Sequence, residues 1–264
     1  MKHTIQKLSI QVLITLSLIV TCHVYADEQR GLEIAKQADL KDTGYNDSTA
    51  RLVMELKNKQ GNTSIRHLRV KNLEVEGDGD KGMSIFDQPA DIKGTAFLTY
   101  SHSLKADEQW LYLPSLKRIK RISSKNKSGP FMGSEFAYED ISSQEVDKYT
   151  YKYIKDETIN GIDCFIIERY PAYEHSGYKR QIVWINKQEY RPEKIDFYDR
   201  KNALLKTLVY SDYKQYLGQY WRADKMHINN HQTGKSTLLS WFDYEFRTGL
   251  SDQDFSRNSL KRAK

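Results

Sequence analysis

YTYKYIKDETINGIDCFIIERY, at residues 149–170, reads as two β-strands joined by a tight turn. From Tyr149 to Tyr153 every second residue is a tyrosine, so the aromatic rings share one face of an extended chain. Asn160-Gly161 follows, and this pair readily adopts the left-handed conformations that a type I′ hairpin turn requires. Residues 164–170 then return as an apolar strand. The segment therefore predicts an antiparallel hairpin.

The two-residue period continues on both sides of this hairpin, with short polar turns between the strands. One helix is expected ahead of them, over Gly31 to Leu40, and Thr43-Gly44 ends its partial apolar stripe. We therefore expect a mainly β, single-domain protein: an incomplete antiparallel β-barrel or strongly curved sheet, with a few helices closing its open side. The other expected strands are 52–56, 65–75, 83–86, 95–100, 108–113, 117–122, 180–185, 194–198, 204–213, 220–228 and 237–246.

The N-terminus has the order of a secretory signal peptide. Lys2 and Lys7 precede an apolar stretch, and Val24-Tyr25-Ala26 supplies the small residues of a cleavage site. We expect residues 1–26 to be removed and residues 27–264 to form one exported domain. A short membrane anchor is the first alternative, but the apolar stretch is too short for a spanning helix.

A lipoprotein anchored through Cys22 is the second alternative. Thr21 is a poor residue immediately before a lipidated cysteine, so cleavage after Ala26 and soluble export are favoured. Export would leave Cys164 as the one cysteine, which excludes an intramolecular disulfide. Cys164 lies in a strand-like apolar run, so we expect a packed thiol there and not a nucleophile.

The charge of the chain gives little support to a nucleic-acid-binding role. Removing residues 1–26, which hold two lysines and no acid, lowers the formal net charge from +6 to +4. This excess is small, and an exported protein would not meet nucleic acid. The mean hydropathy of −0.72 with 18 tyrosines is typical of a sheet with one face in water.

No motif for catalysis or for a metal or cofactor is convincing. His227 and His231 are four residues apart, but on a strand this spacing separates them by more than ~13 Å, too far to share one metal. The acidic run at 76–82 lacks the carboxylate that a calcium loop needs, because Pro89 stands at that position. Gly234-Lys235-Ser236 lacks the upstream glycine of a phosphate-binding loop. We expect no enzyme, no metal and no cofactor.

Residues 115–140 differ from the rest of the chain. An alternating basic strand is followed by a Ser/Lys/Gly loop and then by large apolar groups beside a glycine. Exposed loops hold such groups when they fold over something apolar, which is either the protein's own core or a ligand. The basic residues of this strand are expected to contact an anionic headgroup or membrane surface, or else to face solvent. They are Lys117, Arg118, Lys120 and Arg121.

A curved sheet with aromatic residues on its concave face can enclose an apolar pocket. An acyl chain suits such a pocket, because each buried CH₂ contributes about 0.8 kcal/mol. From strand alternation and loop position, the residues expected to line the pocket are Phe97, Trp110, Tyr112, Phe131, Met132 and Phe136.

An ordered set of motifs extends along nearly the whole of residues 27–264. The chain resembles the periplasmic outer membrane lipoprotein-sorting proteins, a LolA-like group. The resemblance implies a LolA/LolB-like incomplete barrel, a periplasmic carrier of a lipid or lipoprotein acyl chain, and an inner-membrane transporter partner of the resistance-nodulation-division type. The motifs that carry it are Gly94–Thr99, Trp110–Pro114, Lys117–Ile122, Phe131–Asp140, Phe197–Arg200, Tyr220–Arg222 and Leu250–Phe255.

Two other functions stay open. An accessory subunit could bind an envelope transporter and hold no lipid, and its concave face would then be filled by its own side chains. A hydrolase of envelope components would need histidines and carboxylates that converge in a cleft. The leading hypothesis is a monomeric carrier that moves a lipid or an acylated lipoprotein between envelope membranes.

Overall fold

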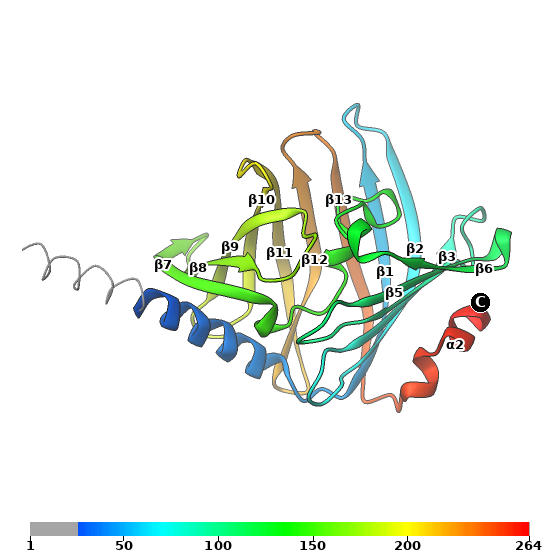
Figure 1. Cartoon of the computed structure of the whole chain (residues 1–264), viewed down its shortest axis with the longest axis horizontal. Helices are drawn as coiled ribbons and strands as arrows, with labels where there is room; N and C mark the ends of the chain where they lie inside the picture. The colour runs from blue at the N-terminus through cyan, green and yellow to red at the C-terminus, as the bar shows by residue number, and fades with distance from the viewer. Residues whose placement is uncertain (1–25, 264) are drawn as a thin grey trace, which may run out of the picture.

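The computed structural model describes residues 26–263 and contains one antiparallel sheet (Figure 1). The sheet has thirteen strands within the described residues, and each strand hydrogen-bonds to its neighbours in antiparallel register. The strands are β1 (Asp47–Lys57), β2 (Thr63–Leu73), β3 (Lys81–Gln88), β4 (Ala96–Tyr100), β5 (Glu108–Leu113), β6 (Arg118–Ile122), β7 (Tyr149–Ile159), β8 (Ile162–Pro171), β9 (Tyr178–Asn186), β10 (Pro192–Asp199), β11 (Leu204–Tyr216), β12 (Tyr220–Asn230) and β13 (Ser236–Phe246).

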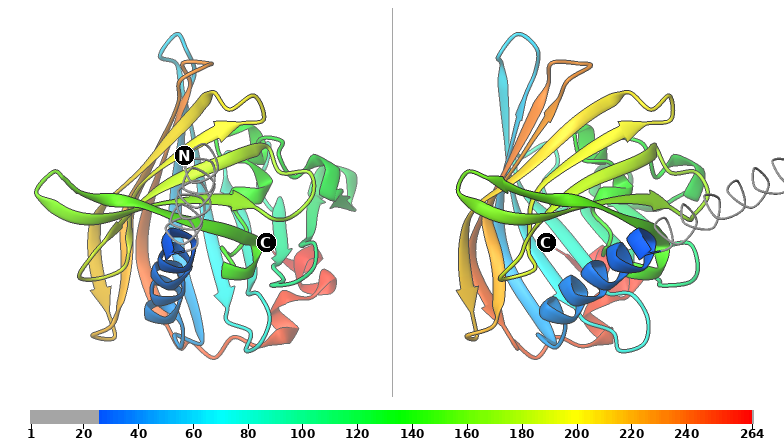
Figure 2. Two further views of the ribbon diagram at one scale, coloured as in Figure 1. Left: turned by 60° about the vertical axis from the view of Figure 1, so that its left-hand side comes forward. Right: turned by 90° about the vertical axis from the view of Figure 1, so that its left-hand side faces the viewer.

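The first and last strands meet at the centre of the sheet. The strand order is β6-β5-β4-β3-β2-β1-β13-β12-β11-β10-β9-β8-β7, so the chain forms two meanders that are joined where β1 pairs with β13. Ser48 lies opposite Phe246, and Leu52 lies opposite Trp241. The sheet curves strongly but does not close, because β6 and β7 are its two edges (Figure 2).

The N-terminal helix, residues 26–42, lies across the open side of the curved sheet (Figure 2). Ile34 and Ala35 from this helix are buried in the core on the concave side of the sheet. Gly31 makes the close approach possible, because a Cβ there would lie 2.8 Å from backbone atoms of Lys152 and Tyr153 on β7. The helix therefore covers part of the β7 edge as well as the opening.

The second helix, α2 (Arg257–Arg262), packs on the opposite, outer face of the sheet. Leu260 from α2 and Phe255 from the preceding 3₁₀ turn (Asp252–Phe255) are fully buried against β3, β4 and β5. Both faces of these three strands are consequently covered. No helix within residues 26–263 is both long and apolar enough to span a bilayer.

A crossing segment, residues 123–148, connects the two edges of the sheet. It must cross the open side, because β6 and β7 lie at opposite ends of the strand order. The segment contains no strand, and its short 3₁₀ turns are Ser124–Asn126, Phe131–Gly133, Tyr138–Asp140 and Val146–Lys148. A fifth short turn, Pro114–Leu116, joins β5 to β6.

The structure confirms the predicted fold class, an open and mainly β architecture with two helices. All of the expected strands are present, and the expected helix is longer at both ends. One of the two helices closes the open side as predicted, whereas α2 covers the outer face. The predicted signal peptide lies outside the described residues except for Ala26.

Candidate functional site

The crossing segment places its largest side chains in the concave side of the sheet. Phe131 is 1% exposed and Phe136 is 2% exposed. The ring of Phe131 lies 5.0 Å from that of Phe97 and 6.1 Å from that of Phe86, and its other neighbour is Tyr138 at 5.6 Å. The concave side next to β3 and β4 is thus filled by aromatic groups of the protein itself.

A sharp bend allows Phe131 and Phe136 to point inward together. Met132 and Gly133 both have positive φ values, 50° and 80°, and a glycine tolerates this conformation without strain. The hydroxyl of Ser134 donates a 2.7 Å hydrogen bond to the Phe131 carbonyl and closes the bend. Arg66 on β2 donates to the Met132 carbonyl, which fixes the tip against the centre of the sheet.

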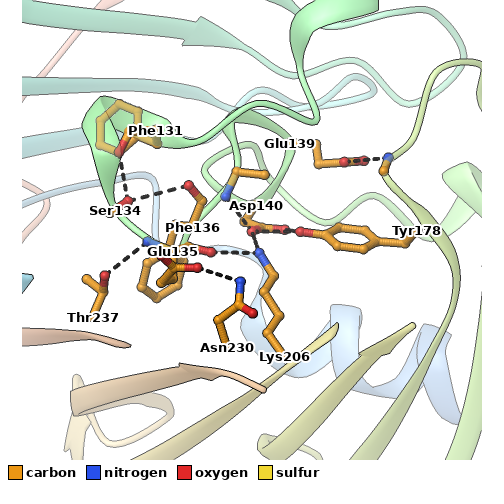
Figure 3. A network of polar contacts seen from close by, with 12 residues as sticks. Phe131, Ser134, Glu135, Phe136, Glu139, Asp140, Tyr178, Lys206, Asn230 and Thr237 are labelled. Carbon is orange, nitrogen blue, oxygen red and sulfur yellow. Dashed lines mark hydrogen bonds and ion pairs between the residues drawn. The ribbon is translucent and has the colours of Figure 1, made fainter. Parts of the chain in front are cut away.

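A buried polar seam joins the crossing segment to the strands from β9 to β13 (Figure 3). The ammonium of Lys206 donates to a carboxylate oxygen of Asp140 at 2.7 Å and to the Glu135 carbonyl at 2.8 Å. The side chains of Lys206 and Asp140 are only 4% and 9% exposed. The hydroxyl of Tyr178 donates to the same carboxylate at 2.8 Å. Asp140 also accepts a hydrogen bond from the Ala137 backbone N–H, so both of its carboxylate oxygens have donors.

Glu135 extends this seam toward β12 and β13. Its backbone N–H donates to the Thr237 hydroxyl at 3.0 Å, and its carboxylate accepts from the Asn230 amide at 2.6 Å. These bonds lie beside the Lys206 pair (Figure 3). The segment is therefore held by polar contacts to both halves of the sheet, and on the β3–β4 side also by aromatic contacts.

Glu139 is a second buried acid of the crossing segment. Its carboxylate accepts hydrogen bonds from the Gly177 N–H, the Ser176 hydroxyl and the Tyr173 hydroxyl, at 2.8, 2.8 and 3.0 Å. Burial, reinforced by the neighbouring Asp140 carboxylate, raises the pKa of Glu139 above its ordinary value. A side chain at position 177 would crowd this acid, because a Cβ there would lie 3.0 Å from the carboxylate.

An open groove of about 940 Å³ runs along the outside of this seam. This volume falls within the range of about 300–1,000 Å³ that is usual for small-molecule sites. One wall is the crossing segment from Ser128 to Ala137. The opposite wall comes from β9 and from the β10–β11 and β12–β13 turns, with Gly177, Tyr178, Asp199, Arg200, Lys201, Ala203, Leu204, Leu205, Lys206, Asn230, Gln232 and Lys235.

A solved domain from Vibrio parahaemolyticus, described as an outer membrane lipoprotein-sorting protein domain, is 59% identical to the chain with a TM-score of 0.88. The match covers 89% of this chain and 100% of that domain. The chain belongs to the outer membrane lipoprotein-sorting family. A DUF1329 family protein from Desulfovibrio piger is also similar, at 31% identity and a TM-score of 0.84, with 89% and 99% of the two chains covered.

A LolA superfamily protein from Nitrosomonas europaea shares the fold, with a TM-score of 0.70 at 20% identity, over 88% of this chain and 99% of that one. A family model whose description reads "Uncharacterized protein" matches residues 78–262. No functionally curated protein matches the chain at a significant level. The predicted resemblance to this family is confirmed.

The structure divides the six residues predicted to line a pocket between the two faces of the sheet. Phe97, Phe131 and Phe136 are buried together on the concave side, and Met132 packs partly buried against them. Trp110 and Tyr112 belong to the outer cluster under α2. Strand alternation explains this division. Paired residues on adjacent strands face the same side of the sheet, and Trp110 pairs with Leu98, whereas Phe97 faces the other side.

The four residues predicted as basic contacts lie together at one edge of the sheet. Lys117, Arg118, Lys120 and Arg121 are all exposed on or beside β6. Arg121 forms an ion pair with Glu108 on the adjacent strand at 3.0 Å. The basic strand thus lies at the β6 edge, away from the groove along the seam.

The sequence analysis did not predict the polar seam that holds the crossing segment. Lys206 follows Leu204 and Leu205 and precedes Leu208, so a lysine at an inward position of an apolar strand was the available signal. Its partner, Asp140, is 66 residues away along the chain, and no local pattern connects them.

Proposed function

We propose that this protein is an envelope carrier for a lipid or for the acyl chains of a lipoprotein. The acyl chain would occupy the concave side of the sheet, in the space that Phe131 and Phe136 now fill. The supporting observation is that these two rings come from a crossing segment and not from the sheet itself. A segment without strand pairing can move aside while the sheet stays intact.

The energetics favour an exchange of this kind. When the two rings leave, the walls that remain are apolar side chains of the sheet, including Phe86 and Phe97. An acyl chain that replaces the rings would restore the lost contacts, and each buried CH₂ would contribute about 0.8 kcal/mol. A chain of a dozen or more carbons could therefore offset both the displacement of the rings and the breaking of the seam.

The polar seam would set the cost of opening. Lys206 and Asp140 are paired in a nearly dry setting, so separating them exposes two charges to water, where each is well solvated. The pair therefore holds the segment in place without making its release prohibitively costly. The groove beside the seam is the site where a ligand could first contact the segment.

The carrier is proposed to act in the periplasm, after removal of residues 1–26. A partnership with an inner-membrane transporter of the resistance-nodulation-division type is proposed with it, on the strength of the family resemblance. The family membership and the name of the Vibrio relative, a lipoprotein-sorting domain, support the periplasmic carrier role.

The deciding experiment is organic-solvent extraction of protein purified from its native envelope, followed by mass spectrometry. A stoichiometric lipid or acylated peptide is expected, and its mass would identify the cargo. An empty protein that also takes up no fluorescent acyl probe would contradict the carrier role. That result would favour a transporter-accessory subunit, to which the filled concave face also lends support.

A further inference from the structure

Exposed cations from three separate parts of the chain gather at the β6 end of the sheet. One is in the β3–β4 turn, five are on or beside β6, and two are in the last turn of α2. We call this group the basic end; its members are Lys93, Lys117, Arg118, Lys120, Arg121, Lys125, Lys261 and Arg262.

These parts are neighbours in space. A Cβ at Gly94 would lie 3.4 Å from the side chain of Pro114 and 4.0 Å from the carbonyl of Ala263, so the β3–β4 turn, the β5–β6 turn and the end of α2 meet there. Ile119 on β6 packs in the same apolar cluster as Ala263. Figure 1 shows β6 and α2 at the same end of the molecule.

The charge of this end is as large as that of the whole chain. Its eight cations are accompanied by two acids of the same turns and strands, Asp91 and Glu108, which leaves +6; the formal net charge of all 264 residues is also +6, and that of residues 27–264 is +4. Among the ion pairs of the described residues, Arg121 with Glu108 is the one that involves this set. The rest of residues 27–264 therefore has a small negative formal charge, and the positive charge is concentrated at one end.

A large apolar side chain lies among these cations. Leu116, in the turn between β5 and β6, is 62% exposed and is followed by Lys117 and Arg118. An exposed leucine beside lysines and arginines suits the boundary of an anionic bilayer, where the cations contact headgroups and the leucine enters the acyl region.

We propose that the basic end docks on the surface of an anionic phospholipid membrane. This inference deepens the proposed carrier function by assigning the face with which the carrier meets a membrane. A partner strand that paired with the free edge of β6 is the main competing occupant. It would not use the cations of the β3–β4 turn and of α2, whereas a broad anionic surface can contact all three parts at once.

Flotation with vesicles of phosphatidylcholine, with and without phosphatidylglycerol, tests this proposal on the full mature chain. We expect binding to the anionic vesicles alone, with a steep loss as the salt concentration rises. The Lys117→Glu/Arg118→Glu variant should bind at least about tenfold more weakly, and Leu116→Ser should lose a smaller part.

The matched control is Lys57→Glu/Lys59→Glu, which makes the same change of charge at exposed positions at the end of β1 and in the β1–β2 turn, outside both the basic end and the groove. It should bind vesicles nearly as the unmodified protein does. Absence of vesicle binding, equal binding to neutral vesicles, or an equal loss in the control would overturn the proposal. Circular dichroism of each variant establishes that the fold is retained.

Uptake of an acyl probe from solution separates this inference from the carrier function. The basic-end variants should take up the probe normally, because Leu116, Lys117 and Arg118 lie outside the concave core. Vesicle binding without any probe uptake would leave the docking face standing and remove the carrier function. Probe uptake without vesicle binding would support the carrier function and remove the docking face.

Discussion

Asp80 is a partly buried carboxyl group that, unlike Asp140, has no cationic partner among the described residues. Its two oxygens accept hydrogen bonds from the Val75 N–H at 3.2 Å and from the Tyr45 hydroxyl at 3.1 Å. Burial raises the pKa of Asp80 to about 6, because these two neutral donors replace water only in part. Asp80 therefore becomes charged within the range of mildly acidic pH, at a cost to the folded state.

We predict that Asp80→Asn stabilises the protein at neutral pH by about 1–2 kcal/mol. The folded pKa is raised, so the stability that protonated Asp80 provides is complete below the unfolded pKa near 4 and is lost as the pH rises through about 6. Urea unfolding of both proteins at pH 7 and at pH 3.5 measures the difference. A stabilisation that persists unchanged at pH 3.5 would show that ionisation is not its cause.

Cys164 provides a second prediction at the level of one side chain. The thiol is fully buried, and burial raises its pKa to about 11, so little thiolate forms at neutral pH. Iodoacetamide should therefore leave the folded protein unlabelled at pH 8 and label it rapidly in denaturant. Rapid labelling of the native protein would mean that β8 opens readily.

The N-terminal helix and the crossing segment are the two elements that close the open side, and they are held differently. The helix packs closely at Gly31 and also forms ion pairs through Arg30 and Asp42, most of them exposed, whereas the segment is held by the buried Lys206–Asp140 pair and its neighbours. A change at Gly31 should therefore act through space-filling alone. A change at Lys206 should act through an uncompensated charge.

Gly31→Ala should destabilise the protein by about 1–3 kcal/mol, despite the higher helix propensity of alanine. The new Cβ would lie 2.8 Å from the β7 backbone, which cannot move aside as a flexible side chain could. Lys36→Ala, at an exposed position of the same helix, is the matched control and should be nearly neutral. Thermal unfolding compares the two variants.

Lys206→Met should cost about 3–5 kcal/mol, because it leaves the carboxylate of Asp140 buried without its cation. Lys206→Met/Asp140→Asn should recover part of this loss, since the remaining group is then neutral. Both variants should also take up an acyl probe faster if the segment opens to admit it. Denaturant titration and stopped-flow probe fluorescence measure the two effects, and additive costs in the double variant would argue against a coupled pair.

A feature of the fold could be predicted from the sequence when neighbouring residues determine it. Asn160-Gly161 adopts φ values of 51° and 80° and forms the predicted turn, because two adjacent residues determine it. Alternation located the strands but not their faces, so Trp110 was grouped with Phe97 although the two point to opposite sides. The pairing of β1 with β13 has no local signal at all.

The whole molecule depends on that central pairing. A chain that ends at Lys235 lacks β13, so β1 and β12 each lose one neighbour and the two meanders are no longer joined in the middle of the sheet. We predict that it has no cooperative unfolding transition. A chain that ends at Thr248 loses α2 but keeps β13, and it should unfold cooperatively at a lower temperature. Near-ultraviolet circular dichroism during heating distinguishes these outcomes.

Pairing of the first strand with the last also determines when the protein can fold. Residue 48 contacts residue 246, so loop-closure entropy opposes the central contacts until most of the chain is present. During synthesis each emerging meander would have an unfinished edge, and the complete sheet could form only after the last strand had been released. Such a chain should stay unfolded until its last strand is available, which suits the proposed export, because an unfolded chain can be threaded through a narrow secretion channel and fold at its destination.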